Sequence, residues 1–461
     1  MAIASNIAEP VPGTRAVDGD WPSPGRAWYA LVIFALTLMV NILDRGILAL
    51  LIPPIKADLQ LSDTQVSLLI GFAFVIFYAI MGLPIARLVD TRSRRVILAV
   101  CVSIWSGMTA LCGLAQNFWQ LFWCRVMVGV GEAGSGPATY SMMADLFPRN
   151  MLPRAISVLN FGFVAGQGIS LVVGGLVIKL VADVPEVTLP VLGTLRSWQL
   201  ALIAVGLPGL VIAALMTTVP EPRRRGLLVP QPGAKAKALP IRQVAGFLKE
   251  NRKTYLPMMV GMAIKAVLSF GTAIWLPTMF VREFGWTITR IGVTQGIILM
   301  VCAPIGLMSG SYLAERLTKS GRDDAFVRVV VIAGFFAVPL SVAFPLMPNP
   351  TLALTLYAIN TVILFMVPGP QNAALQAITP NEMRGQVTAV WLFLFNFVGY
   401  GFGPTIIALI TDYVFHDEAR LPEALALSSG VLGTIAMIII MSGMKSYGEM
   451  VRRIRLKEAT A

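Results

Sequence analysis

GLPIARLVDTRSRR, at residues 82–95, is a short basic turn between two long apolar runs, with one acid, Asp90, among its arginines. A looser copy, GSYLAERLTKSGR at residues 310–322, carries Glu315 in the place of Asp90. The two acids lie 225 positions apart in a chain of 461 residues. One copy alone is a weak pattern, but two copies at this spacing, each after an apolar run, indicate a chain built from two related halves.

The composition indicates a membrane protein. Hydrophobic residues make up 56% of the chain, charged residues 13%, and the mean hydropathy is +0.75, more apolar surface than a water-soluble domain can cover. We expect an all-α membrane protein with about twelve transmembrane helices, six in each half, because runs of about 20 apolar residues cross a bilayer as helices that satisfy their own hydrogen bonds. The expected segments are residues 27–52, 65–86, 96–115, 119–144, 155–181, 199–219, 255–281, 287–314, 326–347, 351–378, 384–412 and 425–444.

The lysines and arginines predict the orientation of the chain. If both termini are cytoplasmic, the tails and the loops on their side hold 27 of the 36 lysines and arginines, the outer loops hold 6, and 3 lie inside helices. This bias agrees with the positive-inside rule and places the net charge of +12 at the cytoplasmic surface rather than in nucleic-acid binding. The expected organisation is a cytoplasmic tail at 1–26, a first half at 27–219, a basic cytoplasmic linker at 220–253, a second half at 254–446 and a basic cytoplasmic tail at 447–461.

Five charged side chains fall deep inside the expected helices: Asp44, Arg45, Arg125, Glu132 and Lys265. Each costs at least roughly 2.5–3.5 kcal/mol at the centre of a lone helix, so we expect these groups to face an aqueous cavity or one another. Arg125 and Glu132 are seven residues apart, which places them on nearly the same face of one helix. Asp44 and Arg45 point in directions about 100° apart, so one can face the cavity while the other contacts an adjacent helix.

The carboxylates of Asp44 and Glu132 are the candidate proton-coupling groups. His416, the one histidine of the chain, lies in an expected outer loop and is a poor relay inside the membrane. Substrate arriving beside an arginine would change the balance between the charged and neutral forms of a nearby carboxylate. The alternative is a fixed ion pair that holds the first and fourth transmembrane segments together.

Four segments carry a family resemblance: NILDRGILALLIPPIKADLQLSDTQVSLL from residue 41, CRVMVGVGEAGSGPATYSMMADLFP from residue 124, TAIWLPTMFVREFG from residue 272 and PGPQNAALQAITPNEMRGQVTAVWLFLFNFVGYGFGP from residue 368. The turn at 82–95 resembles the loop between the second and third helices of major facilitator transporters. The four segments resemble the bacterial branch of the spinster family among those transporters. The resemblance implies the major facilitator fold and a place in the bacterial inner membrane.

The resemblance also implies a function. Spinster proteins are proton-coupled carriers of lysolipids and phosphorylated sphingoid bases that work by alternating access. On their pattern, Asp44 and Glu132 would be protonation sites, Arg45 would meet an anionic head group, and Arg125 would support both. The organic anion:cation symporters, which carry carboxylates and sugar acids, share the aspartate–arginine pair and stay an alternative. A drug exporter, or a membrane receptor that keeps the fold and moves nothing, also stays open.

Polar groups of the second half are further candidates for substrate contact. Such groups can line a cavity and hydrogen-bond a head group, or join two helices. With Arg45 and Arg125, the expected substrate-binding residues are Lys265, Asn372, Asn396 and Tyr400.

The two basic turns are candidate gates. An acid among arginines at a cytoplasmic turn can bridge the two halves by charge-assisted hydrogen bonds and stabilise the outward-facing state. The expected gating residues are Asp90, Arg94, Arg95 and Glu315.

The sequence does not indicate an enzyme, a metal centre or a cofactor. No nucleophile, metal-ligand spacing or phosphate-binding glycine loop stands out. The four cysteines, Cys101, Cys112, Cys124 and Cys302, fall inside expected helices without a CxxC pair. We expect a monomer whose partners are a small-molecule or lipid substrate, protons and membrane lipids, with no nucleic acid.

Overall fold

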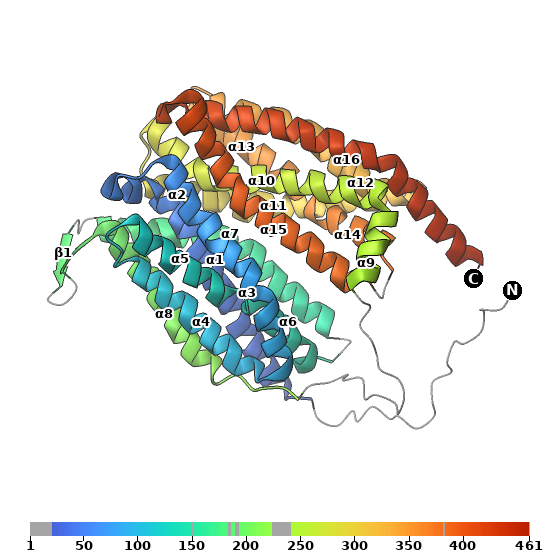
Figure 1. The fold of residues 1–461 in the computed structure, drawn as a ribbon, viewed down its shortest axis with the longest axis horizontal. Coiled ribbons are helices and arrows are strands. Elements are labelled where there is room, and N and C mark those ends of the chain that lie inside the picture. The colour runs from blue at the N-terminus through green and yellow to red at the C-terminus, as the bar shows by residue number, and fades with distance from the viewer. Residues whose placement is uncertain are drawn as a thin grey trace.

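The computed structural model describes residues 21–148, 151–182, 186–189, 193–223, 241–380 and 383–460. Within these ranges nearly every residue lies in a helix. Figure 1 shows two helical bundles side by side, the first coloured blue to green and the second yellow-green to red. The division into two helical halves expected from the repeated turn is visible in this view.

The first bundle begins with α1 and contains two interrupted segments. Its helices are α1 (Pro24–Leu59), α2 (Asp63–Ile70), α3 (Phe72–Thr91), α4 (Arg94–Cys112), α5 (Phe118–Glu132), α6 (Ser135–Leu146), α7 (Leu152–Ala182) and α8 (Ser197–Met216). Gly71 separates α2 from α3, and a Cβ at this position would lie 2.6 Å from the carbonyl oxygen of Tyr400. Glycine therefore permits the close approach of the second half at this break.

The second bundle follows a short connecting helix, α9 (Ile241–Glu250). Its elements are α10 (Arg252–Phe284), α11 (Ile288–Lys319), α12 (Ala325–Ala343), η1 (Phe344–Leu346), α13 (Pro350–Phe365), α14 (Pro368–Ile378), α15 (Arg384–Leu409), the π-helical η2 (Ile410–Phe415), η3 (Glu418–Arg420) and α16 (Leu421–Thr460). Pro368 opens α14 and lacks the N–H that would continue α13. α9 packs on the second bundle, where Val244 is buried and the ring of Phe247 lies 5.5 Å from that of Tyr255.

Ten helical segments in the described part of the chain are long and apolar enough to cross a membrane, and Gly166–Val181 of α7 is a shorter apolar stretch. The segment α5–α6 carries Arg125 and Glu132 and is correspondingly less apolar. The ten long segments, α7 and the α5–α6 segment together are the twelve expected among the described residues. The all-α membrane fold is therefore confirmed. One feature was not expected: β1 (Glu186–Leu189) pairs antiparallel with β2 (Gly193–Arg196) between α7 and α8.

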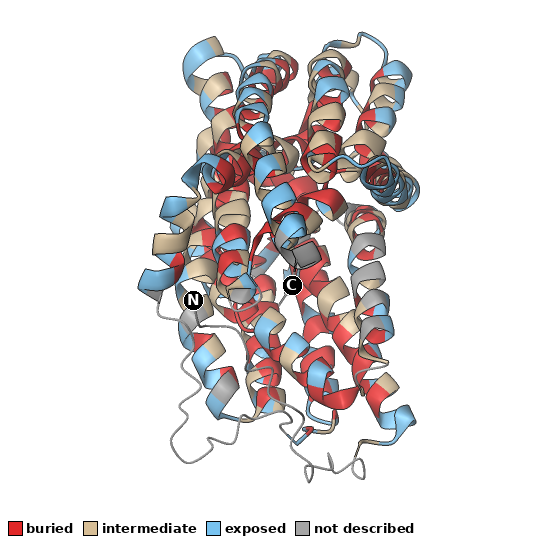
Figure 2. Cartoon of the chain, turned by 90° about the vertical axis from the view of Figure 1, so that its right-hand side faces the viewer, coloured by how far each residue is buried: buried red, intermediate tan, exposed pale blue. Residues whose placement is uncertain are grey.

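Burial separates the inside of each bundle from its outer surface, as Figure 2 shows. Large apolar side chains remain exposed on the outside, such as Leu180 at 76% and Met308 at 74%. Buried charges instead lie inside the bundle, with Asp44 and Glu132 at 0% exposure. This distribution suits a protein whose outer surface meets lipid.

The two bundles contact one another along α7 and α11, α1 and α10, and α2–α3 and α15. A Cβ added at Gly296 of α11 would lie 2.5 Å from the carbonyl oxygen of Gly168 in α7. Small residues thus bring the backbones of these two helices together, as they do between membrane helices generally.

Candidate functional site

α1 and α5 bring together the buried charges of the first half. The Arg45 guanidinium donates to Glu132 Oε2 from Nη2 at 2.5 Å and from Nε at 2.8 Å. Glu132 is fully buried, whereas the Arg45 side chain is 21% exposed. The first and fourth transmembrane segments are therefore joined by an ion pair whose cation is still accessible from one side.

Aromatic rings surround the Arg45 guanidinium. Its carbon lies 4.5 Å from the ring centre of Phe74 and 5.5 Å from those of Tyr78 and Tyr400. Phe74 and Tyr78 come from α3 and Tyr400 from α15, so both halves contribute to this cation–π site. Of the polar groups expected in the second half, Tyr400 is the one that the structure places beside Arg45.

Asp44 points away from its neighbour, as the helix geometry predicts. Its Oδ2 accepts a hydrogen bond of 3.2 Å from the hydroxyl of Thr109 on α4. Its Oδ1 has no hydrogen-bond partner among the described residues. This carboxylate is fully buried and can take up a proton without breaking an ion pair.

Arg125 completes the cluster and is 2% exposed. Its guanidinium carbon lies 5.5 Å from the ring centre of Phe74, while its Nε and Nη1 have no hydrogen-bond partner in the described part of the chain. Oε1 of Glu132 is also without a partner there. Buried polar atoms are rarely left unpaired, so these donors and acceptors mark a place for water, a proton or a ligand.

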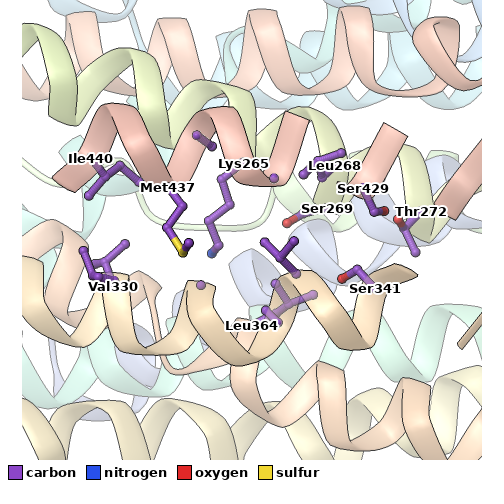
Figure 3. Close-up of a pocket in the computed structure, with 16 residues that line it drawn as sticks. Lys265, Leu268, Ser269, Thr272, Val330, Ser341, Leu364, Ser429, Met437 and Ile440 are labelled. Atoms are coloured by element: carbon purple, nitrogen blue, oxygen red, sulfur yellow. The ribbon is translucent and has the colours of Figure 1, made fainter. Parts of the chain in front are cut away.

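Lys265 lies apart from this cluster. It projects into a cavity of about 50 Å³ inside the second half, between α10, α12, α13 and α16 (Figure 3). The cavity is mostly apolar, with hydroxyls from Ser269, Thr272, Ser341 and Ser429 in its lining, and every lining residue belongs to the second half. The expectation that Lys265 faces a cavity fits this placement, but the cavity is a separate one.

The other two candidates of the second half do not contact the cluster in any interaction that the structure describes. Asn372 is exposed on α14. Asn396 donates from Nδ2 to the carbonyl oxygen of Leu392 in its own helix at 2.9 Å. Their role in substrate contact stays a prediction.

In this structure the arginines of the basic turn at 82–95 form their described contacts within the first half. Arg94 is buried, forms an ion pair with Asp145, and donates from Nε to Glu221 Oε1 at 3.1 Å. The backbone N–H of Arg95 donates to Glu221 Oε2 at 2.8 Å. Partial burial favours the neutral form of Glu221, but these donors and the hydroxyl of Ser93 outweigh it and lower the pKa of the Glu221 carboxyl.

Two gating candidates remain. Asp90 belongs to α3, but its side chain lies outside the described residues. Glu315 is exposed and pairs with Lys319 of the same helix at 2.6 Å. The four gating candidates are therefore not assembled into one bridge between the halves in the described contacts.

A polar cluster between the halves was not found from the sequence. Asp63 of α2 is fully buried and accepts from Lys56 Nζ at 2.5 Å and from Arg282 Nη2 at 2.7 Å. Asp412 of η2 accepts from the backbone N–H of Thr64 at 2.8 Å and from its hydroxyl at 2.7 Å.

We call Lys56, Asp63, Thr64, Arg282 and Asp412 the inter-half lock. α2 and α3 follow one another along a single segment, so the lock lies at the end of the molecule opposite the turn at 82–95. Arg282 lies 219 positions from its partner Asp63, so local patterns in the sequence carry no signal of this contact.

The sequence matches the model of one protein family, described as Major Facilitator Superfamily, over residues 34–404. It is 28% identical over 431 residues to an MFS-type efflux pump of Mycolicibacterium smegmatis, covering 93% of this chain and 92% of that protein. It is 24% identical over 386 residues to the hexuronate transporter of Bacillus subtilis, covering 83% of this chain and 87% of that protein.

A solved structure has the same architecture. It is a crystal structure of a bacterial homolog of the human lysosomal transporter spinster, in an inward-facing and unoccupied conformation. The TM-score is 0.74 at 23% sequence identity, covering 94% of this chain and 98% of that chain. At this identity the likeness concerns the fold.

Proposed function

Because the chain belongs to the Major Facilitator Superfamily, a family of transporters rather than enzymes, we propose that it is a proton-coupled secondary transporter of an anionic amphipathic lipid. Lysophospholipids and sphingoid-base phosphates are the substrate class. The observation that carries the proposal is the position of Arg45, which pairs with a buried carboxylate of its own half and contacts an aromatic ring of the other half. One cation thus links a proton site, a head-group site and the contact between the halves.

Coupling follows from competition for the Arg45 guanidinium. A phosphate or carboxylate that binds Arg45 through two parallel hydrogen bonds displaces Glu132 Oε2 from the same donors. A displaced carboxylate inside a low-dielectric bundle is costly as an anion, so it takes up a proton. Substrate binding and protonation of Glu132 are therefore linked events.

Asp44 and Arg125 have supporting roles in this scheme. Asp44 has a free Oδ1 and serves as the second protonation site, held by Thr109. The guanidinium of Arg125 packs on the ring of Phe74, next to the Arg45 ion pair. Its unpaired N–H groups stabilise the anion that occupies the cluster, whether carboxylate or head group. Tyr400 lies beside Arg45 and contacts the head group with it, Asn372 and Asn396 contact other parts of the substrate, and Lys265 stays in the separate cavity of the second half.

In alternating access, the two ends of the molecule open and close in turn. The inter-half lock closes one end, and we assign that end to the outside because the basic turns lie at the other. Opening of the lock lets Asp90, Arg94, Arg95 and Glu315 approach one another and close the cytoplasmic end. In this proposal the chain works as a monomer in the bacterial inner membrane, with both termini cytoplasmic.

A chain-length series tests the substrate class. For a lysolipid or sphingoid phosphate, removal of each buried methylene should cost roughly 0.8 kcal/mol of binding free energy. Affinities of purified protein for lysophosphatidic acids of decreasing acyl length, measured by thermal shift in detergent, should fall step by step. Affinities that do not change with acyl length would remove lipids from the substrate list.

A small organic acid is the second candidate substrate. The relative in Bacillus subtilis is a hexuronate transporter, and a guanidinium binds carboxylate as well as phosphate. Glucuronate in the same assay distinguishes the two candidates, because it has no acyl chain to bury. Stabilisation by glucuronate together with a flat lysolipid series would favour this second candidate.

A further inference from the structure

A shallow groove of about 450 Å³, largely open to solvent, lies between α10 and α16, outside the charged cluster of the first half. Its lining consists of Lys253, Pro257, Ser442, Lys445, Ser446 and Glu449. Lys253 is the second residue of α10, which places the groove at the end of the second half beside α9. All six residues belong to the second half, and the proposed transport site uses none of them.

The groove holds two cations and one anion that have no ion-pair partner among the described residues. Lys253, Lys445 and Glu449 are exposed, and the described ion pairs include none of the three. The hydroxyl of Ser442 donates to the carbonyl oxygen of Ile439 at 2.6 Å, which leaves its oxygen able to accept. The groove thus offers cationic donors beside one carboxylate and one hydroxyl acceptor.

The groove lies directly beside an exposed apolar band on the same two helices. Toward the middle of the same two helices, exposed apolar side chains follow at once: Leu256 at 60% and Val260 at 37% on α10, and Ile438 at 60% and Met441 at 51% on α16. Charged groups that lie directly beside an exposed apolar band mark the interface between hydrocarbon and water.

We propose that this groove binds the head group of a zwitterionic aminophospholipid. The phosphate lies between the ammonium groups of Lys253 and Lys445, and the primary ammonium of the head group lies at Glu449 and Ser442. The acyl chains extend over the exposed apolar side chains of α10 and α16. This inference depends on the placement of the chain in a membrane and is independent of the transported substrate.

The charge pattern selects against the other common head groups. Phosphatidylglycerol offers a phosphate but leaves Glu449 facing a net negative lipid without a cation. Phosphatidylcholine carries a quaternary ammonium that has no N–H to donate to a carboxylate. Only a primary ammonium next to the phosphate satisfies both signs of charge in the groove.

Native mass spectrometry of the purified full chain, with POPE, POPG and POPC added at equal concentration, tests the proposal. The wild type should retain POPE more than either other lipid. Each of Lys253→Ala and Lys445→Ala should lower POPE retention about fivefold, in line with about 1 kcal/mol for each cation at a membrane surface. Glu449→Gln should abolish the preference for POPE over POPG.

The control is Arg252→Ala, an exposed cation beside Lys253 that does not line the groove, and it should retain POPE as the wild type does. Lys445→Gln keeps a long polar side chain without the charge and should match Lys445→Ala, which separates loss of charge from loss of packing. Equal retention of the three lipids, tighter retention of POPG than of POPE, or full retention of POPE by the lysine variants would overturn the proposal.

Discussion

Arg45 of α1 and Tyr400 of α15 come from different halves, and the guanidinium carbon lies 5.5 Å from the centre of the tyrosine ring. The same guanidinium donates to Glu132 of α5 at 2.5 and 2.8 Å. A ligand that draws Arg45 from its carboxylate therefore changes a contact between the halves at the same time. Differential contact of this kind is what allows a ligand to shift a conformational equilibrium.

Glu132→Gln should abolish flux driven by a pH gradient without unfolding the protein. The amide oxygen can still accept from Arg45, so the helices stay joined, but the side chain no longer exchanges a proton. Asp44→Asn should act in the same direction. Flux into proteoliposomes under an imposed pH gradient is the measurement, with the exposed Glu283→Gln as control. Proton-driven flux at the wild-type rate in Glu132→Gln would remove this residue from the coupling mechanism.

Arg45→Lys should weaken binding of an anionic lipid, and Arg45→Ala should weaken it more. Lysine keeps the charge but loses the two parallel N–H groups and the planar face that lies over Phe74. Loss of a charge-assisted hydrogen bond costs about 1.5–3 kcal/mol, or roughly 10- to 150-fold in affinity. Titration of lysophosphatidic acid by thermal shift checks the order, and equal affinity in all three proteins would contradict it.

Asp63→Asn should open the inter-half lock. The buried carboxylate accepts from Lys56 and Arg282, and removal of one partner of a buried ion pair costs about 3–5 kcal/mol. Spin labels at the exposed positions Ala57 and Ala419, in a protein free of its native cysteines, should report a longer distance by double electron–electron resonance. Asp324→Asn removes an acid that pairs with Arg328 inside the second half and should leave the distance unchanged.

Lys265→Met should raise the melting temperature. The ammonium has no ion pair among the described residues and lies in a mostly apolar cavity, and such a charge costs at least roughly 2.5 kcal/mol at the centre of a membrane helix. Methionine fills a similar volume without the charge. Thermal unfolding in detergent is the measurement, with the exposed Lys249→Met as control. A lower melting temperature in Lys265→Met would mean that the ammonium has a compensating partner.

Glu221 should make the basic turn sensitive to acid. Because the pKa of this carboxyl is lowered in the folded protein, its contribution to stability is present above the unfolded value of about 4.3 and is lost as the pH falls through the folded value. Unfolding temperatures between pH 7 and pH 3 should therefore fall less steeply in Glu221→Gln than in the wild type. Parallel pH profiles for the two proteins would show that the contacts to Ser93 and Arg94 do not stabilise the fold.

The sequence predicts the membrane segments because each is a local run of apolar residues, and it predicts the buried charges because each interrupts such a run. The ion pair between Asp63 and Arg282 joins residues that are distant in the chain, so no local pattern of the sequence predicts it. The aromatic contacts of Arg45 with Phe74 and Tyr78 do have a local signal. Two aromatic residues four apart share a helix face and could have been proposed as neighbours of the Arg45 cation. The cavity around Lys265 depends on how four helices pack, which spacing along one helix does not specify.

Gly168 of α7 and Gly296 of α11 let two backbones approach directly, with the side chains of Met300 and Val172 packed beside the contact. When the angle between the two helices changes, side chains elsewhere must exchange partners, whereas here the two backbones stay in contact and only Met300 and Val172 adjust beside them. The axis of rotation between the halves would then pass close to these two glycines. A methyl group added at either position would push the two helices apart and displace this axis, so its effect would be on the conformational change as well as on stability.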